Sequence, residues 1–265
     1  MIRSAENNTS SFCLQKWYLD CVSEKGEAFI GYSAKLNWKS LGLAYASFLD
    51  FDGDNLTSGT SLLKERLPEI SGDCVVWESE NLGCAGKWQN IGSSLPALKL
   101  FENDVGSVIW NARFPLSEVR LKRSGSDLAG LGYAEKLDLT IPPWRLPIEE
   151  LKWGRFISKD IYIVWVVWSG SQPLRVLYLN GKKIEGATVS ENGVHWEEGT
   201  LQHKQFYVLR EGPIVATALS KIPGIRTVFP EKIVNMHERK WLSSSVVTLN
   251  GITHAGWTIH EIVQF

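Results

Sequence analysis

Hydrophobic and polar residues alternate with a period of two along most of the chain. In IGYSAKLNW, residues 30–38, every second position is apolar and the positions between are small or polar, which predicts a half-buried β-strand. The run IYIVWVVW, residues 161–168, is β-branched or aromatic throughout and predicts a strand buried on both faces. Helical spacing is weak, and only TSLLKERL (60–67) and PIEELKW (147–153) fit one or two helical turns. The pattern therefore predicts an all-β protein.

Short turn signals separate the predicted strands. Asn-Gly pairs at 180–181, 192–193 and 250–251, and an Asp-Gly pair at 52–53, each stand between two strand-like runs. These pairs favour two-residue hairpin turns, because such turns need a positive φ that Gly and Asn adopt at little cost. Consecutive hairpins form antiparallel meanders, which close into barrels or sandwiches that protect their edges.

The length of 265 residues fits one large domain or two of about 130 residues each. The glycine-rich segment SGSDLAGLGYAE, residues 124–135, interrupts the strand pattern, and strands resume after it. We therefore predict two β domains, residues 1–125 and 126–265, although no residue-level repeat relates them. Three prolines lie between residues 142 and 147. Since proline cannot join a central ladder, this segment is expected to cross between the two units or to cover a barrel end.

Charge is balanced, with 28 basic and 29 acidic residues and no tract of like charges. This composition argues against a nucleic-acid partner and gives no reason to expect an anionic membrane surface as partner. No apolar run reaches the roughly 18 residues of a membrane-spanning helix, and the N-terminal residues lack the apolar core of a signal peptide. We therefore expect a soluble, cytoplasmic protein.

Cysteine and histidine spacing gives no disulfide or metal signature. The four cysteines have no CxxC spacing and are expected to be small core residues. The five histidines lack HxxxH and HExxH spacing, so no metal site is predicted. The sequence also has no nucleophile-elbow, phosphate-loop or dinucleotide-binding motif, and no cofactor is expected.

Tryptophan is unusually abundant, with 12 residues spread from Trp17 to Trp257. Large β-sheet proteins use Trp to fill their cores, which is the simpler interpretation. The alternative is an aromatic-walled cavity, since Trp contributes a large apolar surface and one N–H that can orient a bound molecule. On that interpretation the expected partner is a hydrophobic small molecule. The sequence does not specify an oligomeric state.

Four segments resemble one family of β proteins. They are KWYLDCVSEKGEAFIGYSAKLNW (16–38), WNARFPLSEVRL (110–121), GLGYAEKL (130–137) and GWTIHEIV (256–263). These segments resemble strands of the carotenoid 1,2-hydratase (hydroxyneurosporene synthase) and AttH-like family. The resemblance implies two lipocalin-like antiparallel β-barrel units of the calycin group, packed together. It also implies natural-product chemistry, since lipocalin-like relatives add water to polyene termini or cyclise natural products.

Glu135 is the first candidate for catalysis. It follows the Gly-Tyr pair of GLGYAEKL, where the hydratases of the family carry Asp and His. Hydration or cyclisation of an alkene starts with a proton from a neutral carboxylic acid. Burial among aromatic rings such as Trp144 and Trp153 would raise the pKa of Glu135 and keep it neutral. The alternative is an ion pair of Glu135 with Arg145 or Arg155, which would lower that pKa and hold the interdomain loop in place.

Asp20 is the second candidate. In the predicted strand WYLD, Trp17 and Leu19 share one face, and Tyr18 and Asp20 share the other. If the second face lines a cavity, Asp20 is the second carboxyl group of an acid–base pair. If that face contacts water, both residues belong to the surface. The candidates for substrate binding are Trp17, Tyr18, Tyr32, Tyr133, Trp144, Trp153, Arg155 and His260.

Two functions of different classes follow from these features. The first is a lipocalin-like enzyme that binds a hydrophobic isoprenoid or polyketide-like natural product and catalyses acid-assisted cyclisation, isomerisation or hydration. Orientation of a flexible chain in an apolar pocket lowers the barrier by itself, so few catalytic groups are needed. The second is a non-catalytic carrier of a hydrophobic small molecule. A third interpretation is a structural protein whose barrels are packed solid by side chains.

Overall fold

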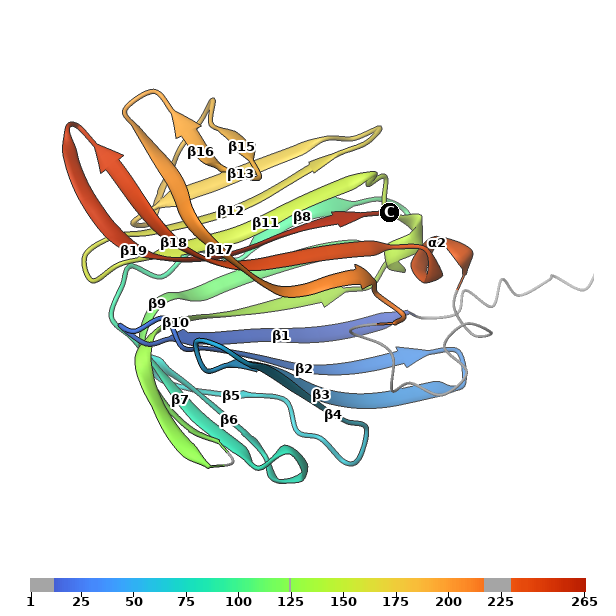
Figure 1. Ribbon diagram of the computed structural model, residues 1–265. Helices are drawn as coiled ribbons and strands as arrows, with labels where there is room; N and C mark the ends of the chain where they lie inside the picture. The colour runs from blue at the N-terminus through green and yellow to red at the C-terminus, as the bar shows by residue number, and fades with distance from the viewer. Residues whose placement is uncertain (1–11, 124, 217–229) are drawn as a thin grey trace, which may run out of the picture.

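The computed structural model describes residues 12–123, 125–216 and 230–265, which form two antiparallel sheets (Figure 1). The first sheet contains β1 (Cys13–Val22), β2 (Ala28–Trp38), β3 (Leu41–Phe51), β4 (Leu56–Ser61), β5 (Glu69–Ser71), β6 (Cys74–Ser79), β7 (Cys84–Asn90), β8 (Leu98–Glu102), β9 (Ser107–Arg123) and β10 (Ser126–Leu139). The second contains β11 (Glu150–Ile157), β12 (Tyr162–Ser169), β13 (Leu174–Leu179), β14 (Lys182–Lys183), β15 (Thr188–Ser190), β16 (Gly193–Trp196), β17 (Gly199–Pro213), β18 (His237–Leu249) and β19 (Ile252–Gln264).

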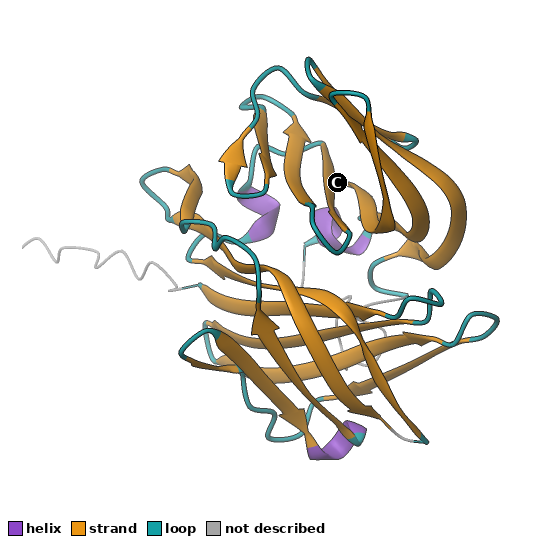
Figure 2. Cartoon of the chain, turned by 90° about the vertical axis from the view of Figure 1, so that its left-hand side faces the viewer, coloured by secondary structure: helices purple, strands orange, loops and turns teal. Residues whose placement is uncertain are grey.

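Each sheet is a meander whose first and last strands are neighbours. β1 pairs with β10 in the first sheet, and β11 pairs with β19 in the second. The strand order is β4-β3-β2-β1-β10-β9-β7-β6-β5, with β8 beside β9, and β14-β13-β12-β11-β19-β18-β17-β16-β15. Both sheets curl strongly (Figure 2) but keep two edge strands each, so they are half-barrels rather than closed barrels. This arrangement confirms the predicted all-β, lipocalin-like fold class in its open form.

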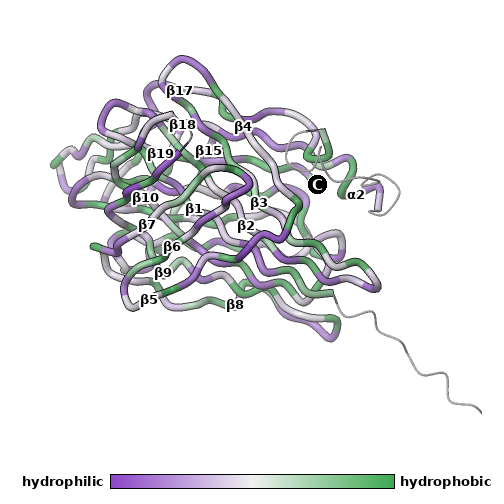
Figure 3. Tube along the Cα trace, turned by 90° about the horizontal axis from the view of Figure 1, so that it is seen from below, coloured by the Kyte–Doolittle hydropathy of each residue, from purple (hydrophilic) through white to green (hydrophobic). Residues whose placement is uncertain are grey.

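Hydrophobic and hydrophilic residues alternate along the strands (Figure 3), and among the described residues the buried apolar side chains of the strands form three main layers. One layer lies on one face of the first sheet and includes Trp17 and Leu19. A second belongs to the second sheet and includes Trp165. The third lies between the two sheets and takes side chains from both, among them Tyr18 and Trp153. The predicted division of β1 into a Trp17 face and a Tyr18 face is therefore confirmed.

The two strands predicted most directly from the pattern are confirmed, and the two predicted helical turns are wrong. Residues 30–38 lie within β2, and the run 161–168 corresponds to β12. Residues 147–153 enter β11, because Leu151 and Trp153 stand two positions apart and face the inter-sheet layer as strand neighbours. Residues 60–67 end β4 and continue without a helix. The helical segments that the structure describes are η1 (Glu80–Leu82), η2 (Pro143–Arg145) and α2 (Glu231–Val234).

Two of the four predicted two-residue turns agree with the structure, and the other two differ from it. Both residues of 180–181 and of 250–251 have positive φ, at 47° and 84° and at 50° and 82°, so these two-residue turns are confirmed. The hairpin between β15 and β16 turns one residue earlier than predicted, at 191–192, and Gly193 already pairs in β16. The β3–β4 connection is a four-residue loop, 52–55, held by hydrogen bonds to the Asp52 carboxylate.

The domain boundary predicted after residue 125 falls between β9 and β10, which pair with each other inside the first sheet. The chain passes from the first sheet to the second over residues 140–149, where the proline-rich segment lies. The glycines before it have a packing role in β10. A Cβ atom on Gly132 would lie 2.0 Å from the carbonyl oxygen of Asp20, so only glycine allows the two strands to approach this closely.

Three cysteines, Cys21, Cys74 and Cys84, are buried as free thiols, in agreement with their predicted role as core residues, and Cys13 is partly exposed. Across the residues that the structure describes, no helix has both the length and the apolar composition needed to cross a bilayer.

Candidate functional site

A pocket of about 370 Å³ lies between the two sheets. Its lining comes from both sheets, from the crossing segment 140–149 and from α2. Most of the lining is apolar. The charged side chains that line it are Lys16, Glu135, Arg210, Glu238 and Glu261. Small-molecule sites have this character, since apolar walls bury the ligand and a few polar groups orient it.

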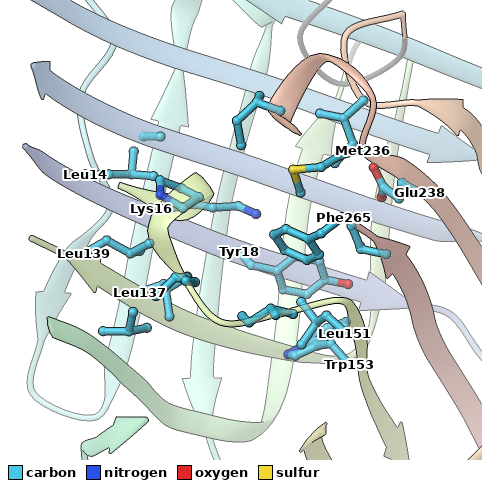
Figure 4. Close-up of a pocket in the computed structure, with 18 of the residues that line it drawn as sticks. Leu14, Lys16, Tyr18, Leu137, Leu139, Leu151, Trp153, Met236, Glu238 and Phe265 are labelled. Atoms are coloured by element: carbon cyan, nitrogen blue, oxygen red, sulfur yellow. The ribbon is translucent and has the colours of Figure 1, made fainter. Parts of the chain in front are cut away.

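The pocket-facing residues of the first sheet change from apolar to polar along β1 and β10. Residues opposite each other on neighbouring strands point to the same face, as do residues two apart on one strand. β1 presents Leu14, Lys16 and Tyr18 in this order. The β10 partner of Tyr18 is Glu135, whereas the partners of Leu14 and Lys16 are leucines. In Figure 4 these leucines lie on the left, and Tyr18 and Trp153 lie further to the right.

The second sheet places a polar row against the polar end of this wall. Trp153 on β11 pairs with Glu261 on β19, and Glu261 pairs with Lys240 on β18. Lys240 pairs in turn with Arg210 on β17, next to a β-bulge. The Tyr18 ring lies 4.7 Å from the Trp153 ring, edge to face, and brings the two sheets into contact at this level.

Glu135 lies where the polar parts of the two walls meet. Its Oε2 atom accepts hydrogen bonds from the Trp110 Nε1–H, from the Tyr133 hydroxyl at 2.5 Å and from the Trp153 Nε1–H at 3.2 Å. All three donors are neutral. Among the described residues no hydrogen bond reaches Oε1. One carboxyl oxygen is therefore fixed, and the other is available to a molecule in the pocket.

Burial raises the pKa of Glu135 above its ordinary value, while its three hydrogen bonds and the charge of Lys16 oppose this rise. A carboxyl group with a raised pKa keeps its proton to a higher pH, as a general acid requires. The ion pair that sequence reasoning left open, with Arg145 or Arg155, does not form within the described part of the chain, and Arg155 binds Asp20 instead.

Asp20 has a different environment. Its side chain and that of Arg155 are both 0% exposed, with Nε 2.9 Å from Oδ2 and the second nitrogen 2.7 Å from Oδ1. Arg155 also donates to the Trp257 carbonyl oxygen at 2.8 Å, and Asp20 accepts the Tyr133 N–H at 3.2 Å. Burial raises the pKa of Asp20, and the Arg155 charge opposes that rise. Asp20 does not line the pocket; the pair joins the two sheets instead.

Three cations surround the Tyr32 ring. The Nζ of Lys16 lies 5.2 Å from the ring centroid, the Arg210 guanidinium 5.5 Å and the Nζ of Lys240 5.8 Å. Two of these cations have a carboxylate in common, because Arg210 and Lys240 approach Glu238 at 3.4 and 3.3 Å. Cations over an aromatic face are attracted by its negative charge density, so the ring itself helps to hold the group.

The three cations differ in their charge partners. Lys240 is 1% exposed and forms a second ion pair with Glu261. Burial lowers the pKa of Lys240 to about 8. Burial also lowers the pKa of Lys16, which forms no ion pair within the described ranges. Lys16 is thus the cation of this cluster that lines the pocket without a carboxylate of its own.

Half of the predicted substrate-binding residues line the pocket. Tyr18, Tyr32 and Trp153 lie at its polar end, and Trp144 belongs to the crossing segment. Tyr133 is outside the lining but contacts Glu135 through its hydroxyl. These residues come from β1, β2, β10, the crossing segment and β11, so the site depends on both sheets.

The other predicted residues lie elsewhere. Trp17 is on the opposite face of β1, inside the apolar layer of the first half-barrel. Arg155 is occupied by Asp20. His260 stacks on Trp241 at 4.9 Å, on the face of β19 opposite to the pocket-lining Glu261.

Six residues that supply polar or charged groups to this region are not among the candidates of the sequence analysis: Lys16, Trp110, Arg210, Glu238, Lys240 and Glu261. Lys16 could have been found, because it stands two residues before Tyr18 and strand alternation puts both on one face. The residues of β17, β18 and β19 come together only through strand pairing. Their register includes a bulge between Val208 and Arg210, which no local pattern predicts.

A histidine pair lies outside the pocket. The rings of His203 and His260 stack at 4.2 Å, and each bonds a serine hydroxyl at 3.1 Å, Ser245 and Ser243 respectively. Burial lowers the pKa of His203 to about 4 and also lowers that of His260, so both rings are neutral at neutral pH. In the described part of the chain, no three His, Cys, Asp or Glu side chains are grouped so that they could hold a metal ion.

No family model and no curated protein matches this sequence. Solved structures match over 96% of the chain. CghA with Sch210972 has a TM-score of 0.57, 10% identity and 89% coverage of that chain. A protein assigned as AttH from Nitrosomonas europaea has a TM-score of 0.57, 11% identity and 93% coverage. Kievitone hydratase from Nectria haematococca has a TM-score of 0.53, 9% identity and 89% coverage.

The chain has the lipocalin-like fold of these proteins. At such identities the similarity concerns the fold alone. The fold that was expected from the family resemblance is therefore confirmed, and the narrower relation to carotenoid hydratases stays a prediction.

Proposed function

We propose that this protein is a lipocalin-like enzyme that binds a hydrophobic natural product between its two sheets and catalyses an acid-assisted cyclisation, isomerisation or hydration. The observation that carries the proposal is Glu135. It lines an apolar pocket, and it is partly buried with a raised pKa. One of its carboxyl oxygens is fixed by neutral donors, and the other has no hydrogen-bond partner among the described residues.

In this proposal Glu135 donates a proton from Oε1 to an alkene carbon or a carbonyl oxygen of the bound molecule. The carboxylate left behind is stabilised at Oε2 by Trp110, Tyr133 and Trp153, which are in position before the reaction starts. Proton transfer by a positioned acid contributes about 10²- to 10⁴-fold to a rate. The apolar walls contribute further by holding a flexible substrate in a reactive conformation.

Two of the proteins with this fold support the proposed class of ligand. CghA binds Sch210972 in its solved structure, and kievitone hydratase is named for the addition of water to an organic compound. Transfer of such a role to this chain rests on the pocket and on Glu135, since fold similarity alone does not specify function.

The first experiment is native mass spectrometry, with solvent extraction, of the protein purified from its own host, to identify a co-purified molecule as substrate or product. Glu135→Gln should then reduce turnover about 10²- to 10⁴-fold with little change in binding. The matched control is Glu78→Gln, at an exposed carboxylate of β6. Turnover of Glu135→Gln at the rate of the unchanged protein contradicts the assigned role.

The second candidate function is a carrier of the same ligand class, favoured by the mostly apolar lining of the pocket. A carrier binds the extracted molecule and returns it unchanged after prolonged incubation. Product formation that depends on Glu135 separates the enzyme from the carrier.

A further inference from the structure

We infer that the substrate carries an acidic oxygen head group, such as an ionised enol, phenol or carboxylic acid, and that Lys16 binds this group beside Tyr32. The inference rests on the proposed function, because it takes the pocket as the substrate site. It adds the chemical class of the head group and the residue that recognises it.

The first argument is the position of Lys16. It comes from β1, lines the pocket between Leu14 and Tyr18, and holds its ammonium group 5.2 Å from the Tyr32 ring centroid. Figure 4 shows this side chain extended from β1 into the pocket. A lysine in such a place is costly unless an anion approaches it, because the ammonium group has lost water and forms no ion pair among the described residues, and the attraction of Glu238 and Glu135 does not outweigh this loss.

The second argument is the charge count at the polar end of the pocket. The cations are Lys16, Arg210 and Lys240, and the carboxylates, which pair with Arg210 and Lys240, are Glu238 and Glu261. While Glu135 keeps its proton, three positive charges face two negative ones, which leaves one positive charge. One anionic oxygen in the pocket neutralises this excess, and it also favours the protonated form of Glu135 that acid catalysis needs.

The third argument is an unsatisfied donor, the Tyr32 hydroxyl. The hydroxyl group of Tyr32 is buried and has no hydrogen-bond partner among the described residues, whereas the hydroxyl group of Tyr18 lies near the Asp20 carboxylate. Buried polar groups are nearly always bonded, so the unpaired Tyr32 hydroxyl beside the cation cluster points to an acceptor that arrives with the ligand. Both rings line the pocket at the level of Glu135.

The remaining lining explains why the ligand must also be apolar. Beyond Lys16 the pocket continues along leucines of β1 and β10 towards Trp144, Ile233 and Phe265. An amphiphile fits this arrangement, with its charged end at Lys16 and its hydrocarbon part along the leucines. The head group then lies next to the free Oε1 of Glu135.

Retinoic acid and retinol are suitable probes, because they share one isoprenoid skeleton and differ in the head group. Binding of each is measured through quenching of tryptophan fluorescence, which the four pocket-lining tryptophans should report. The unchanged protein is expected to bind retinoic acid about tenfold more tightly than retinol, as one charge-assisted hydrogen bond provides. Lys16→Met should remove this preference and leave retinol binding unchanged.

Two further variants make the test specific. Lys16→Arg keeps the charge and should retain most of the preference for the acid, and Lys35→Met removes an exposed lysine of β2 and should change neither affinity. Equal binding of the two probes, or equal weakening of both by Lys16→Met, overturns the head-group assignment while the apolar pocket stands. Failure of both probes to bind contradicts the apolar pocket as well, and with it the proposed function.

Discussion

Asp20, which is buried, and Glu135, which is partly buried, are carboxyl groups on the paired strands β1 and β10, and their hydrogen-bond partners differ in charge. Tyr18 is the strand partner of Glu135, and Tyr133 is the strand partner of Asp20. Both oxygens of Asp20 bind the Arg155 guanidinium, whereas Glu135 has neutral donors on a single oxygen. Burial raises both pKa values. The two carboxyl groups therefore differ in the charge and the number of their hydrogen-bond partners, and not in the direction of the pKa shift.

The largest expected effect comes from breaking the ion pair. Asp20→Asn should lower the free energy of unfolding by about 3–5 kcal/mol, because removal of one partner leaves the other charge buried and uncompensated. Urea unfolding at pH 7, followed by tryptophan fluorescence, measures this loss. The double variant with Arg155→Met removes the orphaned charge and should recover part of the stability. A loss below about 1 kcal/mol for Asp20→Asn would mean that the pair does not hold the sheets together.

His203 extends the comparison to a buried group that has no carboxylate partner among the described residues. Its pKa is lowered to about 4 from an ordinary value of 6.5, so the unfolded chain binds a proton that the folded chain excludes. Stability from this group is complete above pH 6.5 and is lost as the pH falls towards 4. The expected loss is about 3 kcal/mol. His203→Phe should flatten this acid limb relative to the unchanged protein in unfolding curves between pH 7 and pH 4, and parallel limbs contradict the prediction.

Strand alternation is the part of the fold that the sequence reveals most directly. It predicted β2 and β12 and the division of β1 into two faces, because side-chain direction in a strand has a period of two whatever the tertiary structure. The half-barrel form was not predictable, since it depends on whether each sheet bends far enough for its edge strands to meet, β4 and β5 in the first sheet and β14 and β15 in the second. The glycines of β10 resembled a linker because close strand approach and chain flexibility both select glycine.

The candidate site was predictable only where one strand carries the information. Tyr18 and Glu135 were found from local segments, and both face the pocket. Asp20 shares a face with Tyr18, but its partner is Arg155, 135 residues away, and packing of one sheet on the other makes that contact. The cluster of Arg210, Lys240 and its carboxylates depends in the same way on pairing between distant strands.

Asp20→Asn should lower the free energy of unfolding, whereas Glu135→Gln should raise it relative to the unchanged protein as the pH increases. A raised pKa means that the folded chain keeps a proton that the unfolded chain releases, so the unchanged protein loses stability as the pH rises above 4.5 and through the folded pKa. The loss is about 1.4 kcal/mol for each unit by which the pKa is raised. Glutamine stays neutral, so the stability of the variant relative to the unchanged protein should increase over this interval and then become constant. A constant difference from pH 4 to pH 8 contradicts the raised pKa.

The smallest expected effect concerns the hydrogen bonds to Oε2 of Glu135, which lower the pKa that burial raises. Trp110→Phe removes one neutral donor to Oε2, and since that donor favours the ionised carboxylate, the pKa of Glu135 should rise further. One hydrogen bond is worth about 1 kcal/mol, which corresponds to a shift of less than about one pH unit. Carbon-13 NMR titration of the Glu135 carboxyl signal, assigned with Glu135→Gln, measures the shift directly.

Trp88→Phe is the control, because the Nε1–H of Trp88 donates to the Asp20 carbonyl oxygen at 2.6 Å and not to Glu135. A fall in the pKa with Trp110→Phe, or an equal rise with Trp88→Phe, would show that the neutral donors do not set the acidity of Glu135, and the contrast with Asp20 would then rest on the Arg155 charge alone.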